Sequence, residues 1–452
     1  MLEQNKKQIN GKLLCDLLIE DCSLLAADMT IIDHAAIVVT DGQITDILPQ
    51  NAADEKYLAK ETIREHNKLW LPGLVDCHTH TGQQLLKGKV LDELPMIWTR
   101  IMLPFESTLT PAKMRLSAEI AALEMIAGGT TGFVDSGSYY MAEAGKIYQQ
   151  SGLRGALSHS TMDQGNFPAS IKETAAEALA QTDALYDEFH NKGNLKVFYS
   201  LRALMNCSEN LIVQAATRAQ ERGTYLQAHM NEYAGEVNYT LERYGLRPFA
   251  YLAKLGVLSE NFLAAHCLML SAAEKNLLAQ HDVKVVHCPF SNCGKGVPDT
   301  PSLLQENIFV ALGTDGAAHG GLSLWNEMKI FRSVMNAVWG TRLAEPAVMP
   351  AKKILAMSFA GNKLLQGQRA SITGLTVGAP ADMIALDWSK IHLCSSQNRI
   401  NSLLECVNSG DVSDTMVNGK FLLRKGEFLT LDKEKIVSEL QKFTAAEAKK
   451  AC

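Results

Sequence analysis

The chain has 452 residues, 47% of them hydrophobic, and its formal net charge at pH 7 is −6. This length exceeds one ordinary domain, although an α/β barrel can hold about 250 residues or more as a single unit. Charges of both signs are interspersed along the chain. We find no basic stripe of the kind that binds nucleic acid, and we expect no nucleic-acid partner.

Targeting signals are absent from the sequence as given. Residues 1–10 are polar and lack the apolar region of a signal peptide. No apolar run has the length needed to cross a bilayer, so we expect no membrane partner. The ten cysteines are scattered without Cys-x-x-Cys pairs, which suits a reducing compartment. We therefore expect a cytoplasmic protein.

Short strands and turns are predicted for residues 11–50. Asp41-Gly42 lies between two apolar runs and is a strong hairpin signal. The predicted strands are Leu13–Ile19, Ala36–Thr40 and Gln43–Leu48. We assign residues 1–70 to one part of a small β-rich domain.

The middle of the chain, residues 71–370, alternates apolar runs with helical patterns. The helix over Ala112–Ala127 has Thr110 as its N-cap and Pro111 at its first position. Further helices are predicted over Ile171–Asn191, Glu209–Glu221 and Ala272–His281. The predicted strands are Gly73–His78, Thr130–Asp135, Leu153–Ser158, Leu195–Leu201, Tyr225–His229, Phe262–His266, Val283–Cys288 and Ile308–Thr314. Eight such units predict an α/β fold, a (β/α)8 TIM-type barrel.

The β-rich pattern returns near the end of the chain. Strands are predicted over Asp382–Asp387, Thr415–Val417 and Lys420–Arg424, with an Asn418-Gly419 turn before the last one. We expect residues 371–430 to complete a small β-sandwich with residues 1–70. Residues 431–452 are expected to form a C-terminal helical tail.

Five metal-compatible side chains follow the predicted barrel strands. His78 and His80 are one residue apart, so on a strand they point the same way. His229 and His266 end the fifth and sixth strands, and Asp315 follows the eighth. All of them fall at the carboxyl ends of strands, the face where barrel active sites lie. A chance His-x-His pair is the alternative, but it does not explain the other three.

Three imidazoles and one carboxylate form a ligand set suited to zinc or iron. We expect three of the four histidines and Asp315 to hold the ion, with a position left for water. Such an ion lowers the pKa of water toward neutrality. Asp315 can accept the proton, and Glu232, three residues after His229, can carry it to a substrate. The alternative for Glu232 is an ordinary solvated loop acid.

Several motifs resemble those of the amidohydrolase superfamily. They are Pro72–His80, Gly129–Asp135, His229-x-x-Glu232, Ala265-His266-Cys267, His287-Cys288-Pro289-x-Ser291-Asn292, Gly313–Gly316 and Gly378–Asp382. They occur in the family's order and span nearly the whole chain. The sequence is most similar to the branch that holds S-adenosylhomocysteine/methylthioadenosine deaminases, guanine deaminases and triazine hydrolases.

This resemblance implies one catalytic divalent ion, zinc in the first place with iron as the alternative. The residues that it implies as ligands are His78, His80, His229 and Asp315. It also implies that His266 and Glu232 handle protons. The branch lacks a bridging carbamylated lysine, and here Lys196 lies at the wrong end of the fourth strand. The implied reaction is hydrolytic deamination, in which hydroxide attacks the amine-bearing carbon of a heterocycle and ammonia leaves. The zinc deaminases of another fold use a similar non-ligand glutamate.

The resemblance is less direct for the substrate. Glu106, in Leu103-Pro104-Phe105-Glu106, resembles the glutamate that accepts two ribose hydroxyls, and Leu94–Trp98 resembles the segment upstream of it. A carboxylate can accept both O–H donors. The alternative for Glu106 is an acid at a helix start or on the surface.

Three departures from the family pattern bear on specificity. The segment from Trp98 to Glu106 is short, Arg202 stands where many relatives have His-Ala-Pro-Tyr, and His319 falls where they have Ala-Ser-Asn. We expect Arg202 and His319 to face a differently shaped or charged substrate group, such as a carboxylate, unless they are structural. His159, after the third strand, is a further candidate for lining the pocket.

The leading hypothesis is a metal-dependent deaminase of an adenine-type nucleoside or a related heterocycle, a small-molecule substrate. The alternative is a guanine, pterin or triazine deaminase or dechlorinase. A non-catalytic barrel scaffold is disfavoured because every expected ligand is present. We expect a homo-oligomer.

Overall fold

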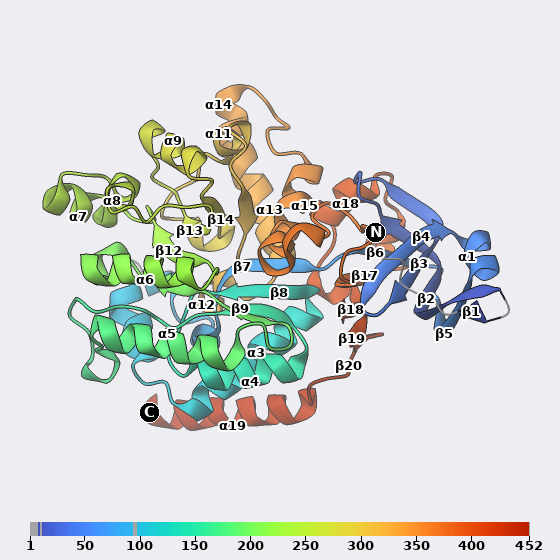
Figure 1. Ribbon diagram of the computed structural model, residues 1–452, viewed down its shortest axis with the longest axis horizontal. Helices are drawn as coiled ribbons and strands as arrows, with labels where there is room; N and C mark the ends of the chain where they lie inside the picture. The colour runs from blue at the N-terminus through green and yellow to red at the C-terminus, as the bar shows by residue number, and fades with distance from the viewer. Residues whose placement is uncertain (1–7, 10, 94–96, 452) are drawn as a thin grey trace. The chain divides into compact units, whose positions relative to one another are not determined.

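The computed structural model describes residues 8–9, 11–93 and 97–451 (Figure 1). Most of the polar N-terminus and the Leu94–Met96 part of the segment before Trp98 lie outside the described residues. The chain divides into two compact units. The first comprises Met1–Val75, Met125–Gly132 and Ala351–Thr430, and the second comprises Asp76–Glu124, Phe133–Pro350 and Leu431–Cys452.

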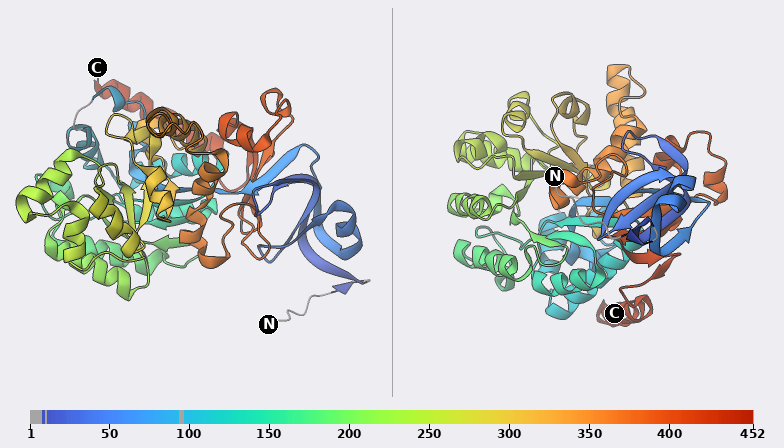
Figure 2. Two further views of the ribbon diagram at one scale, coloured as in Figure 1. Left: turned by 90° about the horizontal axis from the view of Figure 1, so that it is seen from above. Right: turned by 45° about the vertical axis from the view of Figure 1, so that its right-hand side comes forward.

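The strands of the first unit join in one ten-stranded sheet in the order β20-β19-β18-β17-β6-β2-β3-β4, and β1 and β5 also pair with β2. Figure 2 shows the blue N-terminal strands beside the orange-red C-terminal ones. The strands are β1 (Gln8–Ile9), β2 (Lys12–Leu25), β3 (Ile31–Thr40), β4 (Gln43–Pro49), β5 (Tyr57–Arg64), β6 (Lys68–Pro72), β17 (Met383–Asp387), β18 (Val412–Val417), β19 (Lys420–Arg424) and β20 (Glu427–Phe428).

Both predicted hairpins of this unit are confirmed. β3 and β4 are antiparallel and are joined by Asp41 and Gly42, whose φ angles are 50° and 74°. Asn418 and Gly419 join β18 and β19 with φ angles of 49° and 71°. Two consecutive positive φ angles match the right-handed twist of paired strands, and Asx-Gly tolerates them best. A buried cluster that includes Leu17, Ile37, Trp70 and Met416 forms the core.

Two five-stranded parallel sheets, ordered β10-β9-β8-β7-β16 and β11-β12-β13-β14-β15, lie mainly in the second unit, although β7 and β8 begin in residues of the first. Figure 1 shows helices on the outer side of these strands. The strands are β7 (Leu74–His80), β8 (Thr130–Asp135), β9 (Arg154–Leu157), β10 (Leu195–Val197), β11 (Tyr199–Leu201), β12 (Leu226–Met230), β13 (Phe262–His266), β14 (Lys284–His287), β15 (Val310–Leu312) and β16 (Asp315–Gly316). All eight predicted strands have a counterpart here.

Two of the predicted strands are broken where they change partner. The strand predicted over Leu195–Leu201 is interrupted at Phe198, whose N–H donates to Leu157 O, and the next N–H, of Tyr199, donates to Tyr225 O. The strand predicted over Ile308–Thr314 ends at Leu312. Gly313 N–H then donates to His287 O, and Thr314 N–H donates to His78 O. At each break, two successive N–H groups therefore donate to residues that lie in, or directly before, a strand of each sheet.

Helices follow most strands of this unit. The Thr110 hydroxyl accepts from Lys113 N at 3.2 Å, so the predicted cap is confirmed. The helix predicted from Ile171 starts later, because Thr174 and Glu177 form a capping box. The main helices are α3 (Pro111–Ala127), α4 (Met141–Ser151), α5 (Ala175–Phe189), α6 (Glu209–Glu221), α7 (Ala234–Tyr244), α8 (Pro248–Lys254), α9 (Ala272–Gln280), α10 (Pro289–Asn292), α11 (Thr300–Gln305), α12 (Ala317–Gly320), α13 (Leu324–Met335) and α19 (Lys433–Ala451). Among the described residues, no helix combines the length and apolar character of a membrane span.

Candidate metal centre and active site

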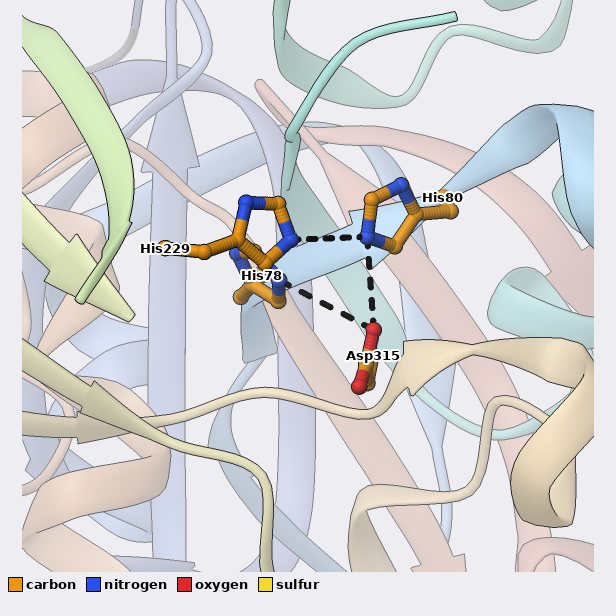
Figure 3. Close-up of side chains that lie close together, drawn as sticks. All are labelled: His78, His80, His229 and Asp315. Atoms are coloured by element: carbon orange, nitrogen blue, oxygen red, sulfur yellow. Dashed lines mark hydrogen bonds and ion pairs between the residues drawn. The ribbon is translucent and has the colours of Figure 1, made fainter. Parts of the chain in front are cut away.

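Three histidines and one aspartate converge at the strand ends of the second unit. His78 and His80 come from β7, His229 from β12 and Asp315 from β16. Figure 3 shows their nitrogen and oxygen atoms turned toward one another. His80 Nε2 lies 3.2 Å from His229 Nε2 and 3.3 Å from Asp315 Oδ1, and His78 Nε2 lies 3.8 Å from the same oxygen.

The donor set fits a divalent metal ion. One ligand atom from each of the four residues lies within 4.8 Å of the others. His78 Nε2 is buried and has no hydrogen-bond partner in the described part of the chain. Burial, followed by the charges of neighbouring histidines, lowers the pKa of His78 and of His229 well below the usual value. Neutral imidazoles with free lone pairs are what zinc-type ions bind.

Local backbone geometry brings the ligands together. The buried Asp76 carboxylate accepts from the backbone N–H of His78 at 3.3 Å and of Thr314 at 3.0 Å, which ties β7 to the segment before β16. A side chain at Gly313 would come within 2.8 Å of His78 backbone atoms. Asp315 and His266 have φ angles of 60° and 68°, a left-handed conformation that is uncommon outside glycine. Such backbone strain is typical of functional sites.

Asp315 is held as a carboxylate. Its Oδ2 accepts a hydrogen bond from the Ser291 hydroxyl, and His319 Nε2 lies 3.6 Å from the same oxygen. Burial alone raises the pKa of Asp315, but His319, the hydrogen bond with His80, His266 and Lys295 outweigh it and hold that pKa well below the usual range. Burial lowers the pKa of His319 to about 4. An ionised Asp315 can therefore both ligate a cation and accept a proton.

Glu232 and His266 lie beside the four ligands. His266 Nε2 is 3.8 Å from Glu232 Oε2, and Asn292 Oδ1 lies 3.0 Å from His266 Nδ1. Glu232 Oε1 accepts a 2.6 Å hydrogen bond from Lys295 Nζ. Burial raises the pKa of Glu232, but His266 and Lys295 lower it by more, so the net direction is downward. Glu232, with a side chain 13% exposed, is thus an ionised and largely shielded carboxylate rather than a solvated loop acid.

A cavity of about 350 Å³ opens onto these groups. Trp98, Arg202 and His319, which the sequence analysis singled out, all line it. Apolar surface comes from Ile97, Trp98, Met102, Met205 and Tyr233. A largely apolar cavity with a few convergent polar groups is typical of a small-molecule site.

Glu106 does not line this cavity among the described residues. It is buried, and its Oε1 accepts from Arg202 Nη2 at 3.1 Å and from Gln83 Nε2 at 2.8 Å. Arg202 Nη1 in turn lies 3.2 Å from His80 Nδ1. Arg202 therefore connects Glu106 to a metal ligand.

His159 lies in a neighbouring cavity of about 380 Å³, which Glu106 also lines. Its Nε2 is 2.8 Å from Glu173 Oε2, and its ring packs edge-on against Tyr139. The structure thus brings His78, His80, His229, Glu232, His266, Asp315, Trp98, Arg202 and His319 to one site, and sets His159 and Glu106 at a second cavity.

Four residues of the site received no predicted role, although Ser291 lies in one of the quoted motifs. Lys295 and Gln83 line the cavity, Ser136 Oγ lies 2.8 Å from His80 Nδ1, and Ser291 contacts Asp315. Ser136 directly follows β8, so the rule that strand ends carry the site would have found it. Lys295 and Gln83 lie in loop and 3-10 segments without such a signal.

Comparisons with known proteins agree with the motif resemblance. Residues 69–422 match the Amidohydrolase family. A 5-methylthioadenosine/S-adenosylhomocysteine deaminase from Syntrophobacter fumaroxidans is 30% identical over 416 residues, 90% of this chain and 92% of that protein. A 5'-deoxyadenosine deaminase from Methanosarcina acetivorans is 31% identical over 449 residues, 96% of this chain and 98% of that protein.

A solved structure extends the comparison to three dimensions. The adenosine deaminase from Xanthomonas campestris with bound zinc has a TM-score of 0.90 at 26% identity, and the match covers 96% of this chain and 99% of that one. The family resemblance predicted from the motifs is confirmed. With the family match extending over most of its length and relatives aligned almost end to end, this chain belongs to the amidohydrolase family.

Proposed function

We propose that the protein is a metal-dependent hydrolytic deaminase that releases ammonia from an aminated purine nucleoside or a related heterocycle. The observation that carries the proposal is the convergence of His78, His80, His229 and Asp315 beside Glu232 in one cavity. The deaminases that this chain resembles over nearly their whole length support the same class of reaction.

Each polar residue has a role in this proposal. A divalent ion held by these four residues, for which we propose zinc, would lower the pKa of water and so supply a nucleophile. Asp315, ionised and itself one of the four ligands, would accept the proton of that water, and Glu232 Oε2 would deliver a proton to a ring nitrogen of the substrate. His266, whose Nε2 lacks a partner among the described residues, polarises the substrate. The zinc in the solved relative supports the choice of ion.

We also propose that the strands of the second unit close into an eight-stranded (β/α)8 barrel within residues 71–370. The hydrogen bonds of Phe198 and Tyr199 at one break, and of Gly313 and Thr314 at the other, support closure on both sides. The paired chain ends support a small β-sandwich from residues 1–70 and 371–430. The helix α19 (Lys433–Ala451) lies within the tail proposed over residues 431–452. The cytoplasmic location and the homo-oligomeric state stay predictions.

A second candidate is a deaminase of a free heterocycle such as guanine, a pterin or a triazine, or a dechlorinase. The contacts of Glu106 favour it. A glutamate that accepts a ribose diol must reach the cavity beside the metal ligands, whereas Glu106 is engaged by Arg202 and Gln83. In this second candidate, Arg202, which lines the cavity, faces the substrate in place of Glu106.

An ammonia-release screen separates the two candidates. The substrates are adenosine, methylthioadenosine, S-adenosylhomocysteine, guanine, pterins and triazines, each with metal-loaded protein. Turnover of the nucleosides supports the first candidate, and turnover of the free heterocycles alone supports the second. Release of neither ammonia nor chloride from any of them would reject the proposed function.

A further inference from the structure

A buried lysine outside the quoted motifs lies against the proposed proton carrier, Glu232. Lys295 follows α10, and its side chain is only 6% exposed. Its Nζ donates to Glu232 Oε1 at 2.6 Å and to Ser291 Oγ at 3.0 Å. The same nitrogen lies 3.9 Å from Asp315 Oδ2 and 5.4 Å from the centre of the Tyr233 ring.

These contacts fix which oxygen of Glu232 is free. Lys295 engages Oε1, so Oε2 is the oxygen that faces His266. Ser291 accepts from Lys295 and donates to Asp315, so one chain of hydrogen bonds joins Glu232 to a metal ligand. An ammonium group has three donors and no acceptor, so it can hold both partners at once.

A carboxylate that moves a proton must be held within hydrogen-bond reach of both the donor and the acceptor of that proton. Without a partner on Oε1, the Glu232 side chain can rotate away, and a displacement of about 1 Å can cost about 100-fold in rate. The charged lysine also offsets the burial of the carboxylate.

We propose that Lys295 is a positioning residue that holds Glu232 Oε1, so that Oε2 points to the reacting atoms. This proposal rests on the proposed deaminase function. It assigns to Lys295 an effect on turnover that passes through Glu232, rather than a direct contact with substrate.

The test is a double-mutant cycle on kcat with metal-loaded protein and a substrate identified in the screen. The variants are Lys295→Met, Glu232→Gln and the double variant. We expect Lys295→Met to lower kcat by about 10- to 100-fold with little change in KM or metal content. Glu232→Gln should lower kcat by about 10²- to 10⁴-fold. The double variant should be no slower than Glu232→Gln.

The chain offers a matched control. Lys275 also pairs with a carboxylate, Asp299, and donates to a serine hydroxyl, Ser302, at 3.0 Å, but it does not line the cavity among the described residues. Lys275→Met should leave kcat unchanged. Methylammonium added to Lys295→Ala, which leaves space for it, should restore part of the activity. Lys295→Arg should retain more activity than Lys295→Met, which a loss of folding would not allow.

The outcomes separate the two proposals. Two results with an active wild-type protein would reject the positioning role and leave the deaminase function standing. In the first, the effects of the Lys295 and Glu232 substitutions on kcat multiply in the double variant. In the second, Lys295→Met has the same kcat as the wild type. If the wild-type protein releases neither ammonia nor chloride from any substrate in the screen, the function and the role fall together.

Discussion

The ion pair between Glu106 and Arg202 lets the structural and substrate-binding roles of Glu106 be separated. Their side chains are 1% and 4% exposed, and 3.1 Å separates Glu106 Oε1 from Arg202 Nη2. Glu106→Gln keeps the shape of the side chain and one oxygen acceptor but removes the negative charge. Arg202 then becomes a buried cation without a counter-charge.

The expected loss of stability follows from this burial. Removing one partner of a buried pair costs about 3–5 kcal/mol, and the oxygen that glutamine retains argues for the lower end, about 3 kcal/mol. The control is Glu93→Gln, which removes an acid from an exposed pair with Arg100, 54% and 52% exposed. That change should cost no more than about 1 kcal/mol. Urea denaturation followed by tryptophan fluorescence measures both variants.

Activity gives the second readout of Glu106→Gln. If Glu106 holds Arg202 in place, nucleosides and free heterocycles lose turnover by similar factors. If Glu106 accepts a ribose diol, KM rises for nucleosides alone. A Glu106→Gln variant as stable as Glu93→Gln, with a KM effect confined to nucleosides, would refute the reasoning from the ion pair.

Three further changes test the site. His78→Ala should lose both activity and the bound metal, measured against about one ion per wild-type chain by elemental analysis, and activity without metal would contradict the mechanism. Gly313→Ala should weaken metal binding although it removes no ligand, because its Cβ would lie 2.8 Å from His78 backbone atoms; Gly410→Ala, with open space around it, is the control. Burial lowers the pKa of His287 from 6.5 to about 4. As the pH drops from about 6.5 to about 4, His287 is therefore protonated in the unfolded state but not in the folded state, and the free energy of unfolding should fall. The shift corresponds to about 3 kcal/mol, and His287→Asn should flatten the pH dependence in denaturant titrations by that amount.

Parallel strands explain why the metal ligands could be predicted from the sequence. His78 and His80 lie in the last three residues of β7, His229 is the next-to-last residue of β12, and Asp315 opens β16 shortly after β15 ends. The carboxyl ends of parallel strands lie at one edge. The His-x-His spacing needs no tertiary information, because alternation along one strand already sets the direction of both rings. The same holds for the Asp41-Gly42 turn, where the required φ angles select the residues.

The breaks in the strands and the contacts of Glu106 could not be predicted in this way. The apolar run through Phe198 continues without interruption, and only the change of partner from Leu157 O to Tyr225 O divides the strand. Arg202 is 96 residues from Glu106 in sequence. No local sequence pattern predicts that Arg202, after the fourth predicted strand, contacts Glu106 in a short helix. That contact depends on how the two segments pack.

The pairing of charges in the cavity favours one metal ion rather than two. Glu232, His266 and Asp315 also bring ligand atoms within 4.8 Å of one another, so by composition they could hold a second cation. Lys295 already supplies a positive charge there, 2.6 Å from Glu232 and 3.9 Å from Asp315. A second divalent ion would have to displace a buried ammonium group that has its own carboxylate and hydroxyl partners, and it would leave that charge without compensation. In the four-residue set that includes His78, the Asp315 oxygen near Lys295 is Oδ2, whereas Oδ1 faces His78 and His80. The neighbouring cation Arg202 is itself paired with Glu106.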